Sequence, residues 1–120
     1  FFKQNAITFV GENNFVVHPD DHSGGGSTDM GDLSQIMPVI HPHTGGATGV
    51  GHSVDYVVED YEQALIRPAK VMAMTVIDLL AEGAVGAKKI KEKSSAPMTK
   101  SQYLAMQERR MSEELYEGRG

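Results

Sequence analysis

The chain has 120 residues, a formal net charge of −5, 40% hydrophobic residues and no cysteine. This length and composition fit one soluble domain at most, and the lack of cysteine excludes disulfides, thiolate metal sites and cysteine nucleophiles. An acidic balance without a stripe of Lys and Arg argues against nucleic acid or an anionic membrane as the main partner. No apolar run is long enough to cross a bilayer, and a reducing cytoplasm is the expected compartment.

Residues 1–23 are expected to form an extended or linker segment. Residues 6–10 (AITFV) are β-branched and aromatic, and residues 14–17 (NFVV) form a second apolar run, which is typical of two short strands. The polar, Gly-rich stretch at 20–26 predicts a loop. Because the chain begins with Phe1 and not with Met, we expect that an upstream portion exists.

Residues 24–86 are expected to form one structural unit that begins with a short helix. Ser27 or Thr28 is placed to cap this helix, which runs from about residue 29 to residue 36 and ends before Pro38. Residues 39–41 then predict a brief strand.

The strongest helical signal extends from about Glu62 to Leu80, where apolar residues recur with helical period on several adjacent faces. Asp60 precedes it with capping-box spacing, and the glycines at 83 and 86 are expected to end it. So wide an apolar surface predicts a helix that is covered on most sides.

A polar connector is predicted at 87–98, and an amphipathic helix at 99–120. Thr99 and Gln102 have the spacing of a capping box at the start of this last helix. Its apolar stripe consists of Leu104, Met111 and Leu115.

All five histidines lie between His18 and His52, and His52 is the best placed of them for metal chemistry. Between Gly51 and Ser53 on a loop, its ring can point outward, and imidazole is a common zinc ligand. A plain surface histidine remains the alternative. His41 and His43 would share one face of an extended segment and could bind metal together, or they are a partly exposed pair beside a proline turn.

The run of glycines that leads into Ser27 and Thr28 offers main-chain donors at a helix start, an arrangement that can hold carboxylates or phosphates. It lacks the lysine of a P-loop and the spacing of a dinucleotide fingerprint, so a flexible connector is the simpler interpretation. Asp29 and Asp32 either orient a ligand histidine or only favour the helix N-terminus.

Four motifs follow one another along the chain: GSTDMGDLSQ at 26–35, PVIHPH at 38–43, GHS at 51–53, and a helix that starts with ALIRPAK at 64–70. In this order they resemble the C-terminal end of a metallo-amidohydrolase of the zinc-dependent aminoacylase and carboxypeptidase-G group. The p-aminobenzoyl-glutamate hydrolase-like branch is the most similar. The resemblance covers about residues 24–82.

This resemblance implies an α/β fold, in which the chain is the C-terminal, helix-rich portion, with short strands, of a mixed-sheet catalytic domain. It also implies a lid domain through which such enzymes form homodimers, and two divalent metal ions, zinc, manganese or cobalt. Only the last metal-binding histidine of the family maps onto this chain, at His52. Gly26, Ser27 and Thr28 would line the substrate side of the site, and Asp29 would orient the metal-binding histidine.

The resulting hypothesis is that the chain is a fragment of a cytoplasmic amidohydrolase. Its small-molecule substrate would be an acyl-amino acid, an aminobenzoyl-glutamate-like compound or a dipeptide, and the catalytic groups would come from the rest of the same polypeptide. The fragment alone is expected to be inactive. The alternative is a self-standing helical interaction module without catalysis, which docks a partner through its last helix.

Overall fold

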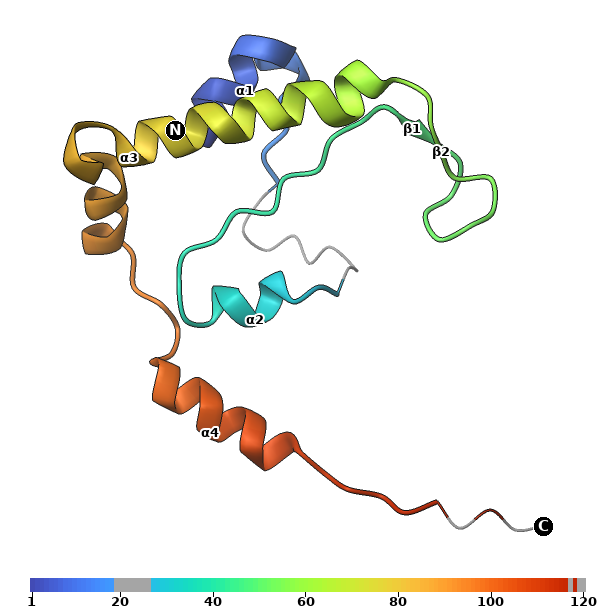
Figure 1. The fold of residues 1–120 in the computed structure, drawn as a ribbon, viewed down its shortest axis with the longest axis vertical. Coiled ribbons are helices and arrows are strands. Elements are labelled where there is room, and N and C mark those ends of the chain that lie inside the picture. The colour runs from blue at the N-terminus through green and yellow to red at the C-terminus, as the bar shows by residue number, and fades with distance from the viewer. Residues whose placement is uncertain (19–26, 117, 119–120) are drawn as a thin grey trace.

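The computed structural model describes residues 1–18, 27–116 and 118. The described part contains four α-helices, namely α1 (Phe2–Val10), α2 (Met30–Ser34), α3 (Arg67–Lys93) and α4 (Lys100–Arg110). A 3-10 turn (η1, Glu12–Asn14) follows α1, and a π-helical turn (η2, Glu62–Ile66) leads into α3. The short strands β1 (Ala47–Thr48) and β2 (Val57–Val58) form a two-stranded antiparallel sheet. Figure 1 shows α1 lying against α3, with α2 and α4 on the other side of α3.

The contact between α1 and α3 forms the small core of the described structure. Ala6 and Val71 are its buried hydrophobic residues, with 6% and 3% of their surface exposed. Beside them the Asn5 side-chain amide donates hydrogen bonds to Thr75 Oγ1 (3.3 Å) and to Asp78 Oδ2 (2.8 Å). These bonds satisfy a buried amide and fix the relative placement of the two helices.

The molecule is far more open than a compact protein of its mass. Its accessible surface is 10273 Å² for 13.0 kDa, whereas a compact monomer of this mass exposes about 6,300 Å². The radius of gyration is 19.2 Å, compared with about 14 Å for a compact chain of this length. Part of the exposed surface is apolar, because large hydrophobic side chains such as Ile77 (65%) and Leu80 (61%) are more than half exposed.

The outer face of α3 contributes much of this exposed apolar surface. Val76, Ile77 and Leu80 lie on this face and are between 49% and 65% exposed. The prediction that this helix is covered on most sides is wrong for the described residues, in which α1 packs on one side of α3 and buries Val71 and Thr75.

The predicted strand at 6–10 is also wrong, because these residues belong to helix α1. Their β-branched character favours a strand locally, but the helix places Asn5 and Ala6 against α3 and buries both. The helix ends at Gly11, which has φ = 79° and whose N–H donates to Ile7 O (2.8 Å). The second predicted strand, at 14–17, is not formed either, because Asn14 ends η1 and residues 15–17 are irregular.

The predicted strand at 39–41 is not formed either. Residues 38–46 run without a sheet partner, because Pro38 and Pro42 have no N–H with which to join a ladder. The short helix predicted at 29–36 is confirmed as α2, although it ends earlier, at Ser34.

The long helix predicted from Glu62 is confirmed, and Asp60 Oδ1 accepts a hydrogen bond from Gln63 N (2.9 Å) as the capping prediction requires. Its predicted end is wrong. The backbone leaves helical geometry at residues 81–84, but the helix then resumes and runs to Lys93. The predicted polar connector at 87–98 is therefore helical over its first half. Gly86 permits this kink, because a Cβ there would lie 2.7 Å from Asp78 O.

Helix α4 begins with the predicted capping box: Gln102 N donates to Thr99 Oγ1 (3.2 Å), and Thr99 N donates to Gln102 Oε1 (2.8 Å). The helix ends at Arg110, however, and the predicted stripe is interrupted because Met111 and Leu115 lie beyond it. No helix in the described residues combines the length and hydrophobicity that a membrane crossing needs.

Candidate functional site

The loop at 49–56 connects β1 to β2 and carries His52. The Ser53 N–H donates to Val50 O (3.0 Å), which closes a tight turn around Gly51 and His52. His52 is exposed and has φ = 67°, in the left-handed region that residues other than glycine rarely occupy. The turn thus presents the imidazole at the surface.

Two further interactions fix the shape of this loop. Gly49 has φ = 82°, and any side chain there would collide with the carbonyl oxygen of Asp55. The Ser53 hydroxyl donates to the Asp55 carboxylate, and this hydrogen bond lowers the pKa of Asp55 below its ordinary value of 3.8. The carboxylate is therefore ionised at neutral pH and held within the loop, two residues from Ser53.

The described residues do not assemble a metal centre around His52. No group of three or more His, Asp or Glu side chains in the described ranges lies in a position to hold a metal ion. Catalytic zinc sites use three protein ligands, and His52 could supply one of these. These residues do not fit a two-metal site by themselves, and further ligands would have to come from elsewhere.

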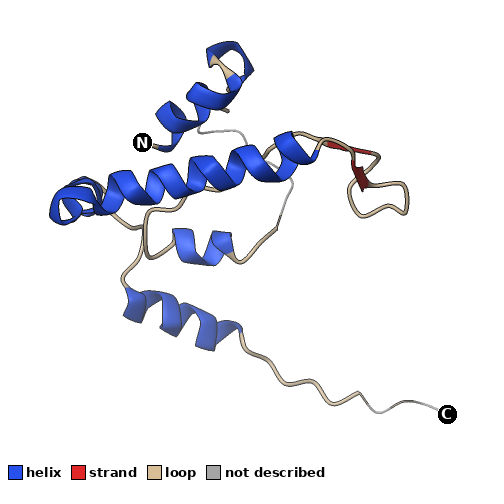
Figure 2. Ribbon diagram, turned by 45° about the horizontal axis from the view of Figure 1, so that its top comes forward, coloured by secondary structure: helices blue, strands red, loops and turns tan. Residues whose placement is uncertain are grey.

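The predicted substrate-side residues lie at the start of α2. Gly26 is outside the described residues. Ser27, Thr28 and Asp29 are exposed, and Thr28 Oγ1 accepts a hydrogen bond from Met30 N (3.0 Å). Asp29 occupies the N-cap position, but its side chain makes no capping hydrogen bond. In both ribbon views the loop that carries His52 stands away from α2, so the described chain does not bring the two together (Figures 1 and 2).

His41 and His43 do lie together, as the extended spacing predicts. Their ring centroids are 5.3 Å apart and the ring planes are inclined by 36°. Both rings are exposed and stand at one end of a cavity of about 920 Å³. They do not form a group of three with another described His, Asp or Glu side chain.

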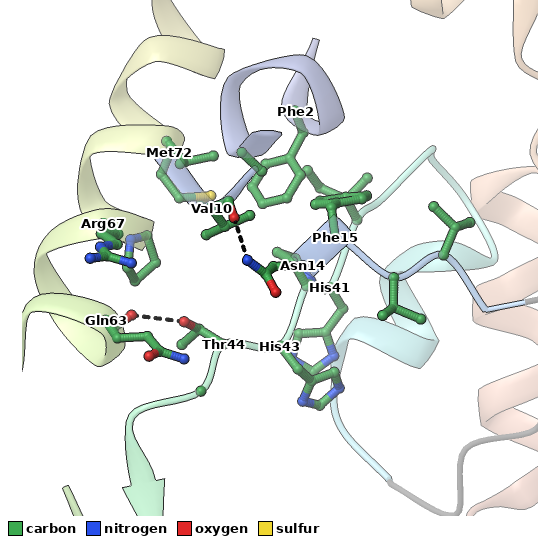
Figure 3. A pocket seen from close by; sticks show the side chains of 18 of the residues that line it. Phe2, Val10, Asn14, Phe15, His41, His43, Thr44, Gln63, Arg67 and Met72 are labelled. Carbon is green, nitrogen blue, oxygen red and sulfur yellow. Dashed lines mark hydrogen bonds between the residues drawn. The ribbon is translucent and has the colours of Figure 1, made fainter. Parts of the chain in front are cut away.

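This cavity is formed by α1, the segment after it, residues 40–45 and the beginning of α3 (Figure 3). Its apolar wall includes Phe2, Val10, Phe15 and Met72. Its polar lining includes Asn14, His41, His43, Thr44, Gln63 and Arg67. The Thr44 hydroxyl donates to Gln63 O (2.8 Å) and joins the irregular segment to the start of the long helix.

Sequence reasoning missed this cavity. Arg67 belongs to a motif that supports the family resemblance, and nothing in the helical period distinguishes it from a surface arginine. Its place in a cavity depends on three stretches that are distant in sequence, at residues 2–18, 40–45 and 63–72. One part of the cavity could be predicted locally: residues two apart on an extended chain lie on the same face, as His41 and His43 do.

Comparison with known proteins gives one partial likeness. Over 80 residues, 62% of this chain, the sequence is 30% identical to a human protein described as Xaa-Arg dipeptidase. The aligned part covers 17% of that protein, so the chain spans about a sixth of its length. No family model matches the chain, and no solved structure matches it. The chain thus resembles a part of a peptidase, a hydrolase that cleaves an amide bond.

Proposed function

We propose that the chain is the C-terminal part of a dinuclear, metal-dependent amidohydrolase, in which His52 is one metal ligand. The 30% identity over 80 residues to a dipeptidase carries this proposal. The substrate class is an amide of an amino acid: a dipeptide, an acyl-amino acid or an aminobenzoyl-glutamate-like compound. The family resemblance of the GSTD, HPH and GHS motifs supports the same assignment.

The open shape of the chain supports its role as a segment of a larger body. The outer face of α3 has no partner among the described residues and is apolar enough to pack against further structure. The fold expected for the intact protein is a mixed sheet covered by helices, of which this chain would supply helices and short strands.

The geometry of His52 supports its role as a ligand. A left-handed conformation of a residue other than glycine costs about 1–2 kcal/mol, and such strain often accompanies function. The turn at 50–53 holds that conformation and exposes the ring, while the Ser53 and Asp55 hydrogen bond braces the loop beside it. In the intact enzyme the remaining ligands and the general base would come from outside the described residues. The part of the reaction assigned to this chain is therefore to hold one ligand nitrogen in place.

The test uses the longest natural polypeptide that contains these residues, loaded with zinc, manganese or cobalt. His52→Ala is expected to lower the metal content and to reduce hydrolysis of a dipeptide panel, one with arginine at the second position included, by at least about 100-fold, because loss of a supporting partner alone costs 10–100-fold. Val54→Ala is the matched control, because Val54 lies in the same loop and is fully exposed. Metal content and hydrolysis unchanged by His52→Ala would refute the proposal.

A further inference from the structure

The cavity beside α1 has a charge pattern that differs from the rest of the chain. The chain contains 16 acidic residues among 120, yet none of the described residues that line the cavity is Asp or Glu. The lining instead includes Arg67 and three histidines, at positions 18, 41 and 43. A site without carboxylates and with a fixed cation favours an anionic ligand.

Arg67 lacks an anionic partner in the described part of the chain. It is half-buried at the start of α3, whereas the nearby Lys70 Nζ forms an ion pair with Glu62 Oε1 (3.7 Å). A guanidinium that is partly removed from water and has no carboxylate partner is stabilised by an external one, which it can bind with two parallel hydrogen bonds.

The residue one turn before Arg67 adds a neutral donor to the same end of the cavity. The Gln63 side-chain amide lies against Gly45, where a Cβ would collide with its Nε2 atom. Figure 3 shows Gln63 in η2 and Arg67 at the start of α3, with His41 and His43 across the cavity. Guanidinium and amide N–H groups both suit carboxylate oxygens.

The opposite part of the cavity is apolar. Phe2 and Val10 of α1, Phe15 after it, and Val71 and Met72 of α3 line this part. The volume of about 920 Å³ falls in the range of small-molecule sites, which combine apolar walls with a few placed polar groups. A ring or short alkyl chain fits these walls, while Arg67 and Gln63 line the polar part of the cavity.

We propose that this cavity binds an organic carboxylate with an aromatic or aliphatic body. Arg67 recognises the carboxylate, and the phenylalanines and Met72 hold the apolar body. His52 is not among the lining residues, so the site is separate from the proposed metal ligand and does not depend on the amidohydrolase assignment.

The first test compares three probes on the 120-residue chain in EDTA, by calorimetry and by chemical-shift mapping. We expect 4-phenylbutyrate to bind about tenfold more tightly than its neutral counterpart 4-phenylbutan-1-ol, because a hydrogen bond to a charged group contributes more than a neutral one. Butyrate, which lacks the ring, should bind more weakly than 4-phenylbutyrate. Equal affinity for the acid and the alcohol, or no binding of either, overturns the proposal.

The second test changes the cation. Arg67→Gln should abolish the preference for the acid over the alcohol, whereas Lys70→Gln should retain it, because Lys70 carries the same charge on the same helix but does not line the cavity. Phe15→Ala should weaken both probes equally. Circular dichroism checks that the helix content of each variant is unchanged, and the probe comparison on the unaltered chain stands even if a variant fails to fold. An equal loss in Arg67→Gln and Lys70→Gln would mean that net charge alone attracts the acid, which also overturns the proposal.

Discussion

Two valines on opposite sides of α3 give a direct measure of how this helix is covered. Val71 faces α1 and is 3% exposed, whereas Val76 lies on the outer face and is 49% exposed. Replacing a buried valine by alanine removes about two carbon groups from the core, which costs about 1.5 kcal/mol in transfer free energy and somewhat more with the cavity that is left. Val71→Ala should therefore destabilise the 120-residue chain by about 2 kcal/mol, and Val76→Ala by about half of the transfer value, roughly 0.8 kcal/mol or less.

The same pair distinguishes an isolated module from a segment of a larger enzyme. In a longer polypeptide that covers the outer face, Val76→Ala should cost about as much as Val71→Ala, because both side chains are then buried. Urea unfolding of both variants, in the 120-residue chain and in the longer polypeptide, provides the comparison. If Val76→Ala costs about 2 kcal/mol in the short chain, the open structure is wrong. If the cost of Val76→Ala stays small in the longer polypeptide, nothing covers this face, and the proposal that the chain is a segment of a larger enzyme fails.

Three further substitutions test individual contacts. Asn5→Ala should destabilise the chain by about 1–2 kcal/mol in urea unfolding, because it removes a buried amide and leaves Thr75 without one of its partners; an unchanged unfolding midpoint would contradict the placement of α1 on α3. Gly49→Ala should disorder the loop at 49–56, visible as faster amide hydrogen exchange there and not in α3, because it combines a positive φ with a backbone collision; equal exchange in both forms would contradict the loop geometry. Ser53→Ala should raise the pKa of Asp55 toward its ordinary value in an NMR titration. Since the folded pKa is lowered, the stabilising contribution of Asp55 is present above pH 3.8 and is lost as the pH falls through the folded value, and Ser53→Ala should weaken this acid dependence.

The features that sequence predicted correctly are those that lie within one helical turn or one stretch of periodic residues. The capping box of Thr99 and Gln102 needs only residues three apart, and the period of apolar residues after Glu62 is visible in the sequence alone. The kink in α3 was not predicted because it depends on the close approach of Gly86 to Asp78 O, a contact between two parts of one helix that the local pattern does not contain.

The errors at the N-terminus have a tertiary cause. Residues 6–10 have β-branched and aromatic side chains, yet Asn5 and Ala6 pack on α3, and the bonding partners of Asn5 lie 70 and 73 residues away. Contacts of this kind outweigh a weak local preference, and no window of the sequence contains them. The same separation explains why the cavity around Arg67 was not predicted, while the pairing of His41 and His43 was.

The amount of exposed surface helps to choose between the two functions considered from sequence. The chain exposes 10273 Å², roughly 4,000 Å² more than a compact monomer of its mass. A standard protein interface covers about 800 Å² on each partner, so one docking helix cannot account for this excess. Helix α4 is also a poor docking element, because two of its three predicted apolar contacts lie beyond its end at Arg110. A surface of this size calls for a permanent covering over several elements, which the remainder of an enzyme provides and a transient partner does not. The excess surface and the partial likeness to a dipeptidase therefore favour the same proposal independently of each other.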